Sequence, residues 1–584
     1  MTETTIARPW LDTDLSVDER VQLLLDAMTI EEKAGLFFHT MIAIGDLEEP
    51  NPVFATPSAR EFLESKQMTH FNLLGAAPTG REIAAWQNAL QQLAASTRLG
   101  IPVTLSTDPR HSFSENPGAS ILAGPFSQWP ETLGLAATRD EELVERFADI
   151  ARQEYTAVGL RVALHPQVDL ATEPRWARQT ATFGEDAELS GKLGAAYIRG
   201  FQGKSFGPGS VSTMTKHFPG GGPQKDGEDP HFPYGREQVY PGGEFELHLK
   251  PFEDALAAGT RQMMPYYGMP VGTEYEEVGF GFNKSVITGL LRERYGFDGL
   301  VCTDWGLISD SEIFGQPFPA RAWGVEDLTP RERIKKVLDA GADQFGGEAN
   351  PELLLELVAD GEITEARLDI SARRILREKF ELGLFENPYV DEDAADEIVG
   401  RADFRAAGED AQRASITVLA NDGALPFARG AKLYVEGIDV AVAEKFADVV
   451  ETPSEADLAI IRLQAPFEER ATMFENFFHA GSLDFPDDVI AHVGEVAAVV
   501  PTVVDVLADR PPILTPLAEV AAAITVNWGA SGTALLDVLS GAFPAQGRLP
   551  FDLPRSMAAV EASRPDVPFD TTDPLFRFGH GLSL

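Results

Sequence analysis

A carboxylate stands at the end of an apolar run in the stretch GFDGLVCTDWGL, residues 296–307. The run Leu-Val-Cys at 300–302 is typical of a buried strand, and Asp304 comes just after it, before Trp305 and Gly306. A positioned carboxylate can act as a nucleophile, and a tryptophan offers an apolar surface that packs on a sugar ring. A glycine lets a ligand approach the backbone closely. We therefore expect Asp304 to be catalytic and Trp305 to bind substrate.

A lysine and a histidine end a second apolar run, in TMTKHFPGGGPQKDGEDPHF at 213–232. Lys216 and His217 are followed by three glycines at 220–222. The spacing G-x-x-x-x-G-K-[ST] of a phosphate-binding loop is absent, because the lysine precedes the glycines. We expect Lys216 and His217 to bind a neutral, polyhydroxylated ligand, with the glycines shaping a loop at the rim of its site.

The same stretch holds four potential metal ligands, His217, Asp226, Asp229 and His231. Their spacing matches neither a zinc-site pattern nor an EF-hand loop. The sequence therefore predicts no metal and no cofactor.

Further polar side chains follow other apolar runs. TDPRHSFSENPG at 107–118 brings Asp108 and Arg110, and Tyr267 ends the run RQMMPYYG. In EPRWARQTATFGED at 173–186, Arg175 and Arg178 flank a tryptophan, although Arg175 fits an ion pair that braces the rim equally well. Acids, cations and aromatic rings gathered in one place describe a pocket for a sugar.

These side chains need a scaffold that brings the ends of several strands together. Apolar runs alternate with longer amphipathic stretches, which indicates crossover units and a parallel sheet. The strands are expected at 102–108, 160–170, 211–218, 261–268 and 299–304, and the clearest helices at 140–159 and 188–203. The number of units favours a (β/α) barrel, whose active site lies where the strands end.

A polar, acid-rich passage, ENPYVDEDAADEIVGRADFR at 386–405, separates this pattern from a second alternation of strands and helices. We predict a barrel over residues 1–388, a linker over 389–408, and an open α/β domain over 409–584. No third domain is expected after it.

The composition restricts the partners. The 584 residues include 48 basic and 91 acidic ones, a net charge of −43, which disfavours binding to nucleic acid or anionic membranes. Cys302 is the only cysteine, so no intrachain disulfide can form. The N-terminus lacks the pattern of a signal peptide, and we expect a cytoplasmic location. The oligomeric state is not predicted.

Taken together, several phrases in a consistent order resemble glycoside hydrolase family 3, the β-glucosidase and exo-β-glucanase family. They include MTIEEKAGLFF (28–38), EPRWARQTATFGED, the KHF strand, LLRERYGFDGLVCTDWG, AQRASITVLANDGALP (411–426) and the ending DPLFRFGHGLSL. The resemblance implies an α/β fold, with an N-terminal (β/α)8 TIM-like barrel followed by an α/β sandwich domain and no fibronectin-like third domain.

The resemblance also implies roles for single residues. Asp304 matches the family's catalytic nucleophile in its S/T-D-W motif. The residues that match sugar-holding positions of the family are Asp108, Arg178, Lys216, His217 and Tyr267.

The general acid/base of two-domain members is a glutamate on a loop of the second domain, here within ADLAIIRLQAPFEERATMFENFFHAGSLDF at 456–485. The family's usual wording is G-E-x-P-Y-x-E, and aligning P-Y with Pro466-Phe467 places Glu469 at the catalytic position. Glu468 and Glu475 are the alternatives, because the loop departs from that pattern.

The expected function is that of a retaining exo-acting β-glycosidase that removes terminal β-D-glucosyl residues from oligosaccharides or glycosides. The open alternatives are another sugar specificity (β-xylosidase, α-L-arabinofuranosidase or N-acetyl-β-glucosaminidase) and a catalytically inactive sugar-binding homologue. N-acetyl-β-glucosaminidase is disfavoured, because a glycine replaces the first loop histidine of the K-H-F-P-G-H-G pattern that such enzymes resemble.

Overall fold

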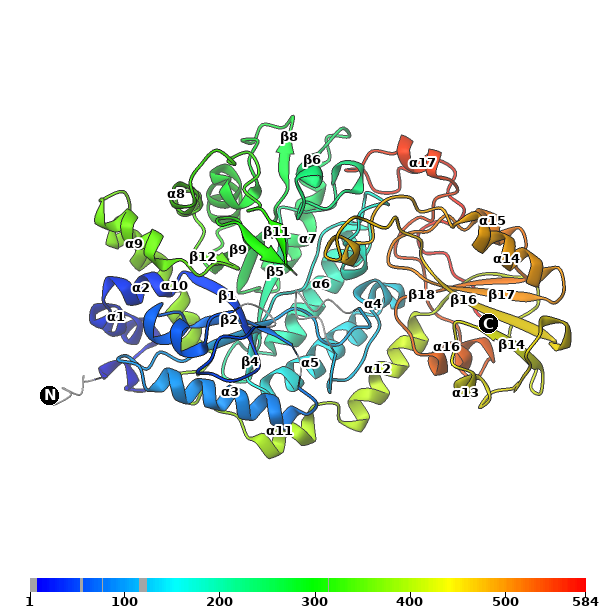
Figure 1. Ribbon diagram of the computed structural model, residues 1–584, viewed down its shortest axis with the longest axis horizontal. Coiled ribbons are helices and arrows are strands. Elements are labelled where there is room, and N and C mark those ends of the chain that lie inside the picture. The colour runs from blue at the N-terminus through cyan, green and yellow to red at the C-terminus, as the bar shows by residue number, and fades with distance from the viewer. Residues whose placement is uncertain (1–7, 53–55, 76, 115–122, 314) are drawn as a thin grey trace.

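The chain forms two domains that lie side by side along its longest axis (Figure 1). The structure is a computed structural model, and it describes residues 8–52, 56–75, 77–114, 123–313 and 315–584. The N-terminal domain is built around a closed barrel and the C-terminal domain around an open sheet.

Eight parallel strands close the barrel in the order β1-β12-β9-β7-β5-β4-β3-β2. They are β1 (Phe38–Ala43), β2 (His70–Leu74), β3 (Thr104–Thr107), β4 (Leu160–Ala163), β5 (Ser212–Phe218), β7 (Gln262–Pro265), β9 (Leu300–Trp305) and β12 (Gln344–Gly346). The (β/α)8 barrel predicted from the sequence is confirmed. The run 160–170 is a shorter strand than expected, because β4 already ends at Ala163.

Helices surround the barrel (Figure 1). They are α1 (Val17–Ala27), α2 (Ile30–Gly35), α3 (Gly80–Ala95), α4 (Thr132–Thr138), α5 (Glu141–Ala157), α6 (Ala187–Gln202), α7 (Phe245–Ala257), α8 (Pro330–Ala340), α9 (Pro351–Ala359) and α10 (Glu365–Glu381). A π-helical segment, Ser285–Arg294, takes the place of a helix between β7 and β9. Reciprocal capping boxes begin several of the helices, for example Thr79 with Glu82 at α3 and Thr329 with Glu332 at α8.

Two short strand pairs decorate the barrel. β6 (Glu237–Val239) pairs in parallel with β8 (Met269–Val271), and β10 (Ser311–Ile313) pairs antiparallel with β11 (Gln316–Phe318). Both pairs belong to segments that follow strands of the barrel, on the side where a site is expected.

The second domain is an α/β sandwich, as predicted. Its six-stranded sheet has the order β13-β18-β17-β16-β14-β15, and only the β13–β18 pair is antiparallel. The strands are β13 (Thr417–Asn421), β14 (Lys432–Glu436), β15 (Asp448–Val449), β16 (Leu458–Gln464), β17 (Thr502–Leu507) and β18 (Ala523–Asn527). Figure 1 shows α14 (Asp487–Ala497) and α15 (Thr515–Ala518) over one face, and α13 (Val440–Ala443) and α16 (Gly532–Leu539) over the other. Each face carries its own apolar core, and α17 (Met557–Ala562) follows near the C-terminus.

The segment predicted as a linker, 389–408, is mostly helical. It contains α11 (Glu392–Ile398) and the start of α12 (Ala402–Ser415), which lead from the barrel to the second domain (Figure 1). None of the described helices is both long and apolar enough to cross a membrane.

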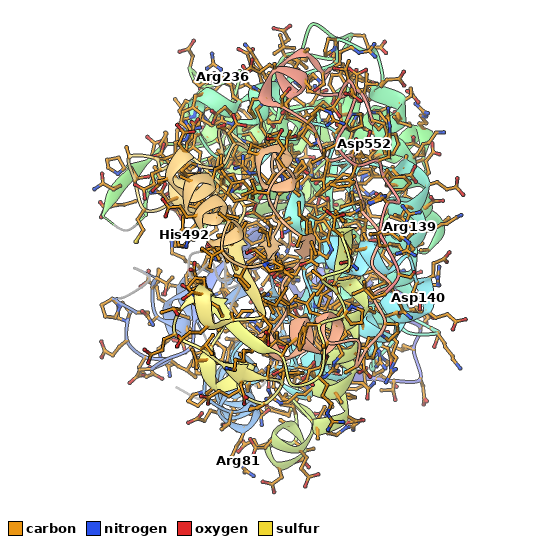
Figure 2. All side chains as sticks on the ribbon, turned by 90° about the vertical axis from the view of Figure 1, so that its right-hand side faces the viewer. Arg81, Arg139, Asp140, Arg236, His492 and Asp552 are labelled. Atoms are coloured by element: carbon orange, nitrogen blue, oxygen red, sulfur yellow. The ribbon has the colours of Figure 1, made fainter. Side chains whose placement is uncertain are left out.

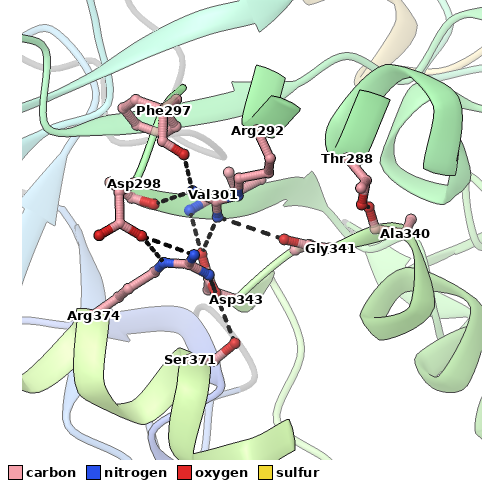
Figure 3. A network of polar contacts seen from close by, with 12 residues as sticks. Thr288, Arg292, Phe297, Asp298, Val301, Ala340, Gly341, Asp343, Ser371 and Arg374 are labelled. Carbon is pink, nitrogen blue, oxygen red and sulfur yellow. Dashed lines mark hydrogen bonds and ion pairs between the residues drawn. The ribbon is translucent and has the colours of Figure 1, made fainter. Parts of the chain in front are cut away.

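A buried aspartate anchors the strand that carries Asp304. Asp343 accepts hydrogen bonds from the Val301 backbone at 2.9 Å, from Arg292 at 2.6 Å and from Ser371 at 2.7 Å, and it pairs with Arg374 at 3.1 Å (Figure 3). These contacts join the beginning of β9 to α10 and to the π-helical segment. The network lies on the face of the barrel where the strands begin, and polar networks on that face serve stability.

The two domains meet in a buried joint. The Glu185 carboxyl group of the barrel accepts backbone N–H groups of Asp552 at 2.6 Å and Phe569 at 2.8 Å. Arg139 of the barrel lies over the Phe578 ring at 4.2 Å. Arg139 and Asp552 are labelled in Figure 2, which views the molecule from its second-domain end. The joint therefore combines polar and aromatic contacts.

Candidate active site

The site residues predicted in the barrel come from the ends of four strands and from one connection. Asp304 and Trp305 end β9, Lys216 and His217 lie near the end of β5, Asp108 follows β3, and Tyr267 follows β7. Arg178 lies in the connection after β4, just before the turn Gln179–Ala181. All of them are on the face where barrel enzymes build their sites.

Asp304 is 7% exposed, and its two carboxylate oxygens have different surroundings. Oδ1 accepts the Trp305 backbone N–H at 2.8 Å. Oδ2 has no hydrogen-bond partner among the described residues and lies 3.7 Å from Nε2 of His217. One oxygen of the predicted nucleophile is therefore held and the other is left for a ligand.

His217 is fully buried, and Asp169 fixes its orientation. The Asp169 Oδ2 atom lies 2.7 Å from His217 Nδ1, and Oδ1 accepts the His217 backbone N–H at 3.1 Å. Burial and the positive charges of Arg178 and Lys216 lower the pKa of His217 well below its usual value. The ring is therefore neutral, and Nδ1–H donates to the carboxylate of Asp169.

This tautomer leaves Nε2 of His217 as an acceptor that faces Oδ2 of Asp304, which is also an acceptor. Both atoms are buried, and neither has a partner in the described part of the chain. Two buried acceptors each call for a donor. A sugar, with several hydroxyl groups, can supply a separate O–H to each of them.

Lys216 and Asp108 form a second polar element. Nζ lies 2.9 Å from Oδ1 of Asp108, with side chains that are 10% and 15% exposed. The pair presents ammonium N–H donors beside a carboxylate, which suits the binding of vicinal hydroxyl groups.

The arginines of the sequence prediction separate into one site residue and two structural ones. Arg178 is half-buried, and its Nη1, which is itself buried, has no partner among residues that the structure describes. Burial acts to lower the pKa of Arg178, but Tyr266, Asp229 and Asp304 raise it, so the cation is maintained. Arg175 instead pairs with Glu173 at 2.8 Å, and Arg110 donates to the carbonyls of residues 73 and 75.

Two aromatic residues frame Asp304. Tyr267 donates a hydrogen bond of 2.8 Å to the Trp305 carbonyl, and burial, aided by the Asp304 charge, raises the pKa of Tyr267 well above its usual value. The Trp305 ring is partly exposed, and the backbone of residues 346 and 347 lies so close to it that a Cβ there would clash. Trp305 therefore keeps exposed apolar surface, as a sugar platform requires.

The glycines have other roles than predicted. Gly306, at φ +68°, makes room for the Arg321 guanidinium, which would meet a Cβ there. The three glycines at 220–222 are buried instead of forming an exposed rim loop: they lie against His248, Tyr266 and Leu170 in turn. The Gly221 N–H donates to Asp169 at 2.6 Å.

The structure adds three residues that were not assigned to the site. Asp169 lies inside the run expected as a strand over 160–170, so a polar residue near a strand end was a signal for it. His231 Nδ1 lies 2.6 Å from Asp229, and its ring is 4.6 Å from that of Tyr267.

No group of three or more His, Cys, Asp or Glu side chains within the described ranges is placed to hold a metal ion.

A loop of the second domain, residues 464–485, lies against this face of the barrel. Arg470 pairs with Glu228 at 2.8 Å, and Tyr234 donates to Glu475 at 2.9 Å. The Phe478 ring packs on His231, with centroids 4.7 Å apart. The site is thus made by both domains.

The three candidate glutamates of this loop are in different environments. Glu468 accepts the Ser482 N–H at 3.2 Å, so it is tied back to its own loop. Glu475 accepts from Thr472 at 2.8 Å and from Tyr234, and these bonds outweigh burial and lower its pKa. Glu469 is exposed, and no hydrogen bond or ion pair with the described part of the chain holds it. Glu469 is therefore the one whose carboxyl group is free to serve a ligand.

A two-domain enzyme that acts on a neutral, polyhydroxylated substrate accounts for this arrangement, and a carboxylate beside an apolar ring makes glycosidic bonds the natural target. Two family models match the chain: the glycosyl hydrolase family 3 N-terminal domain over residues 53–378 and its C-terminal domain over 328–584. The chain belongs to glycosyl hydrolase family 3, and it is a glycoside hydrolase.

Relatives of similar length support the assignment. A probable β-glucosidase C of Aspergillus flavus is 53% identical over 578 residues, which are 98% of this chain and 91% of the relative. A periplasmic β-glucosidase/β-xylosidase of Dickeya chrysanthemi is 42% identical over 599 residues, again 98% of this chain and 91% of the relative.

Solved structures share the fold. A mutant β-glucosidase from Listeria innocua in complex with laminaribiose matches with a TM-score of 0.77 at 22% identity, covering 97% of this chain and 83% of that one. An exo-1,3/1,4-β-glucanase from Pseudoalteromonas has a TM-score of 0.77 at 21% identity, covering 99% and 96%.

Proposed function

We propose that the chain is a retaining, exo-acting β-glucosidase, which removes terminal non-reducing β-D-glucosyl residues from oligosaccharides or glycosides. The observation that carries the proposal is the buried, unpartnered Oδ2 of Asp304, which faces the neutral His217 on the catalytic face of the barrel. The names of the Aspergillus and Dickeya relatives support a β-glucoside as the substrate.

The proposed reaction has two displacements. In the first, a carboxylate oxygen of Asp304 attacks the anomeric carbon while the glycosidic C–O bond breaks and the acid/base glutamate gives its proton to the leaving oxygen. In the second, the same glutamate takes a proton from water, the water oxygen attacks the anomeric carbon, and the bond to Asp304 breaks. The two inversions leave the β-configuration unchanged.

The second-domain loop supports exo action and supplies the acid/base. Residues 464–485 cover one side of the barrel face through Arg470, Tyr234 and Phe478 contacts, and a covered face admits the end of a saccharide more readily than its middle. Glu469 is the first candidate, because Glu468 and Glu475 are engaged by hydrogen bonds. Retention requires carboxyl groups about 5–5.5 Å apart in the complex.

β-Xylosides are a second candidate substrate class, because the Dickeya relative is named for both activities. Assays with aryl β-glucosides, β-xylosides, α-L-arabinofuranosides and N-acetyl-β-glucosaminides rank the specificities directly. The cytoplasmic location stays a prediction, and the Dickeya relative is itself named as periplasmic.

The decisive experiment is the Asp304→Ala variant together with trapping of the intermediate. We expect this variant to remain folded and to lose at least about 10³-fold in kcat on an aryl β-glucoside. A fluorinated glucoside should label the wild-type peptide that contains Asp304. Substantial activity of the variant, or a label on another residue, would overturn the proposal.

A further inference from the structure

A buried arginine joins the two ends of the second-domain loop to the barrel. We call these ends the outgoing leg (464–467) and the returning leg (479–485). Arg510 follows β17 and is fully buried. Its Nη2 donates to the Pro466 carbonyl at 2.6 Å, and its Nη1 donates to the Gly481 carbonyl at 3.0 Å. Nη1 also donates to the carbonyl of Arg175 in the barrel at 3.1 Å. One guanidinium thus contacts the outgoing leg of the loop, its returning leg and the opposite domain.

The preceding residue holds the same two legs through their side chains. Asp509 is bonded to Nδ1 of His479, on the returning leg. The Phe467 ring of the outgoing leg stacks on His479, with centroids 3.9 Å apart and planes 4° from parallel. Asp509 and Arg510 therefore fix both legs from one short turn.

The segment between these legs, residues 468–478, carries all three candidate acid/base glutamates. The Glu468 N–H donates to the Ala480 carbonyl at 2.9 Å, which closes the neck of the loop. Glu469 follows directly beyond this neck. The position of its carboxyl group therefore depends on how the neck is held against the barrel.

Burying a guanidinium between this loop and the barrel costs desolvation free energy. Burial lowers the pKa of Arg510, and its Nε has no partner among the described residues. An apolar side chain of similar volume would avoid the desolvation penalty. What the arginine provides is geometry, because its planar fork fixes several carbonyl oxygens at once.

We propose that Asp509 and Arg510 are positioning residues for catalysis. They hold residues 466–481 of the second-domain loop against the barrel, so that the acid/base glutamate on this loop can protonate the leaving group of a sugar bound at Asp304. The inference rests on the proposed function, in which that loop supplies the general acid.

Leaving groups of different basicity provide the test. A dinitrophenyl glucoside departs without protonation, whereas a phenyl or alkyl glucoside needs the acid. We expect Arg510→Met to lower kcat/KM for the phenyl glucoside by about 10²-fold and that for the dinitrophenyl glucoside by less than about threefold. Arg510→Lys should recover part of the loss, and Asp509→Asn should show the same selectivity to a smaller degree.

Arg161→Met is the matched control. Arg161 is buried and also donates to backbone carbonyls, those of Ser210 at 3.1 Å and Leu382 at 2.9 Å, but at the beginning of β4. Its loss should lower both activities equally, in step with the folded fraction. Equal losses on both glucosides in Arg510→Met, Arg510→Lys and Asp509→Asn would overturn the proposal and leave a structural role only.

The glutamate variants separate this result from the proposed function. If Glu468→Gln, Glu469→Gln and Glu475→Gln all keep full activity on the phenyl glucoside, the assignment of the acid to this loop fails. If one of them shows the selective loss and the Arg510 and Asp509 variants do not, only the positioning role fails.

Discussion

The imidazole of His217 faces the Asp304 carboxylate across 3.7 Å, while Asp169 holds its other nitrogen at 2.7 Å. Asp169 thereby decides which nitrogen carries the proton, and so whether Nε2 can accept a hydrogen bond from a sugar hydroxyl beside Asp304. We expect Asp169→Asn to lower kcat/KM by about 10²-fold, because the amide can present an N–H to Nδ1 and reverse the tautomer.

Monodeoxy aryl glucosides check this relationship. For the substrate that lacks the hydroxyl that donates to Nε2 of His217, the penalty of Asp169→Asn should largely disappear, because that hydrogen bond is already gone. A penalty of the same size on every deoxy substrate would contradict the role of the tautomer.

The Lys216–Asp108 pair should contribute to both stability and sugar binding. Lys216→Met leaves a nearly buried carboxylate without its partner at 2.9 Å, and we expect a loss of about 3–5 kcal/mol in the free energy of unfolding. The double variant with Asp108→Asn should regain much of that stability but bind glucose no better. Chemical denaturation and glucose inhibition constants measure the two effects, and strictly additive losses of stability would count against the pairing.

Sequence patterns were sufficient for the residues that strands deliver. Asp108, Lys216, His217, Tyr267 and Asp304 were predicted because each ends or follows an apolar run, and in a barrel such ends meet. Contacts made by irregular segments were beyond that reasoning: Gly306 makes room for Arg321, which lies later in the same connection after β9, and His231 reaches Tyr267 from a connecting loop. The ranking of the three glutamates depends on hydrogen bonds within one irregular loop, which no periodicity encodes.

Glu469→Gln should behave as the loss of a general acid. We expect its kcat/KM for a phenyl glucoside to fall by about 10²–10⁴-fold, with little change for a dinitrophenyl glucoside. Glu468→Gln should have a weaker effect of equal size on both substrates, because the Glu468 side chain bonds the Ser482 N–H of its own loop. The selective loss in Glu468→Gln or Glu475→Gln instead would reassign the acid.

The ion pair between Arg470 and Glu228 should help to close the loop on the barrel. Both side chains are about a quarter exposed, 25% and 24%, so the attraction is screened by salt. We expect Arg470→Met to lower kcat/KM by up to about fivefold, and high salt to lower the wild type toward the same value. Lys225→Met, which removes the exposed pair with Glu237 on the same rim, is the control and should change neither quantity.

The joint between the domains should make stability depend on pH through Glu185. Burial in the joint, with Asp552 and Asp186 nearby, raises the pKa of Glu185 to about 8 from an ordinary value of 4.5, despite the two backbone N–H groups that it accepts. The folded protein therefore binds more protons than the unfolded chain between these values. The contribution to stability is fully present below about pH 4.5 and is lost as the pH rises through about 8.

Glu185→Gln removes this titration. In the wild type the free energy of unfolding should fall by up to about 1.4 kcal/mol per pH unit across the window, and the variant should lose that part of the slope. Glu188→Gln is the control: Glu188 is an exposed acid at the beginning of α6, three residues after Glu185, and pairs with Lys192 at 2.6 Å, so this variant should keep the wild-type slope. Thermal unfolding of the three proteins across the window measures it, and an unchanged slope in Glu185→Gln would show that other groups govern the pH response of the joint.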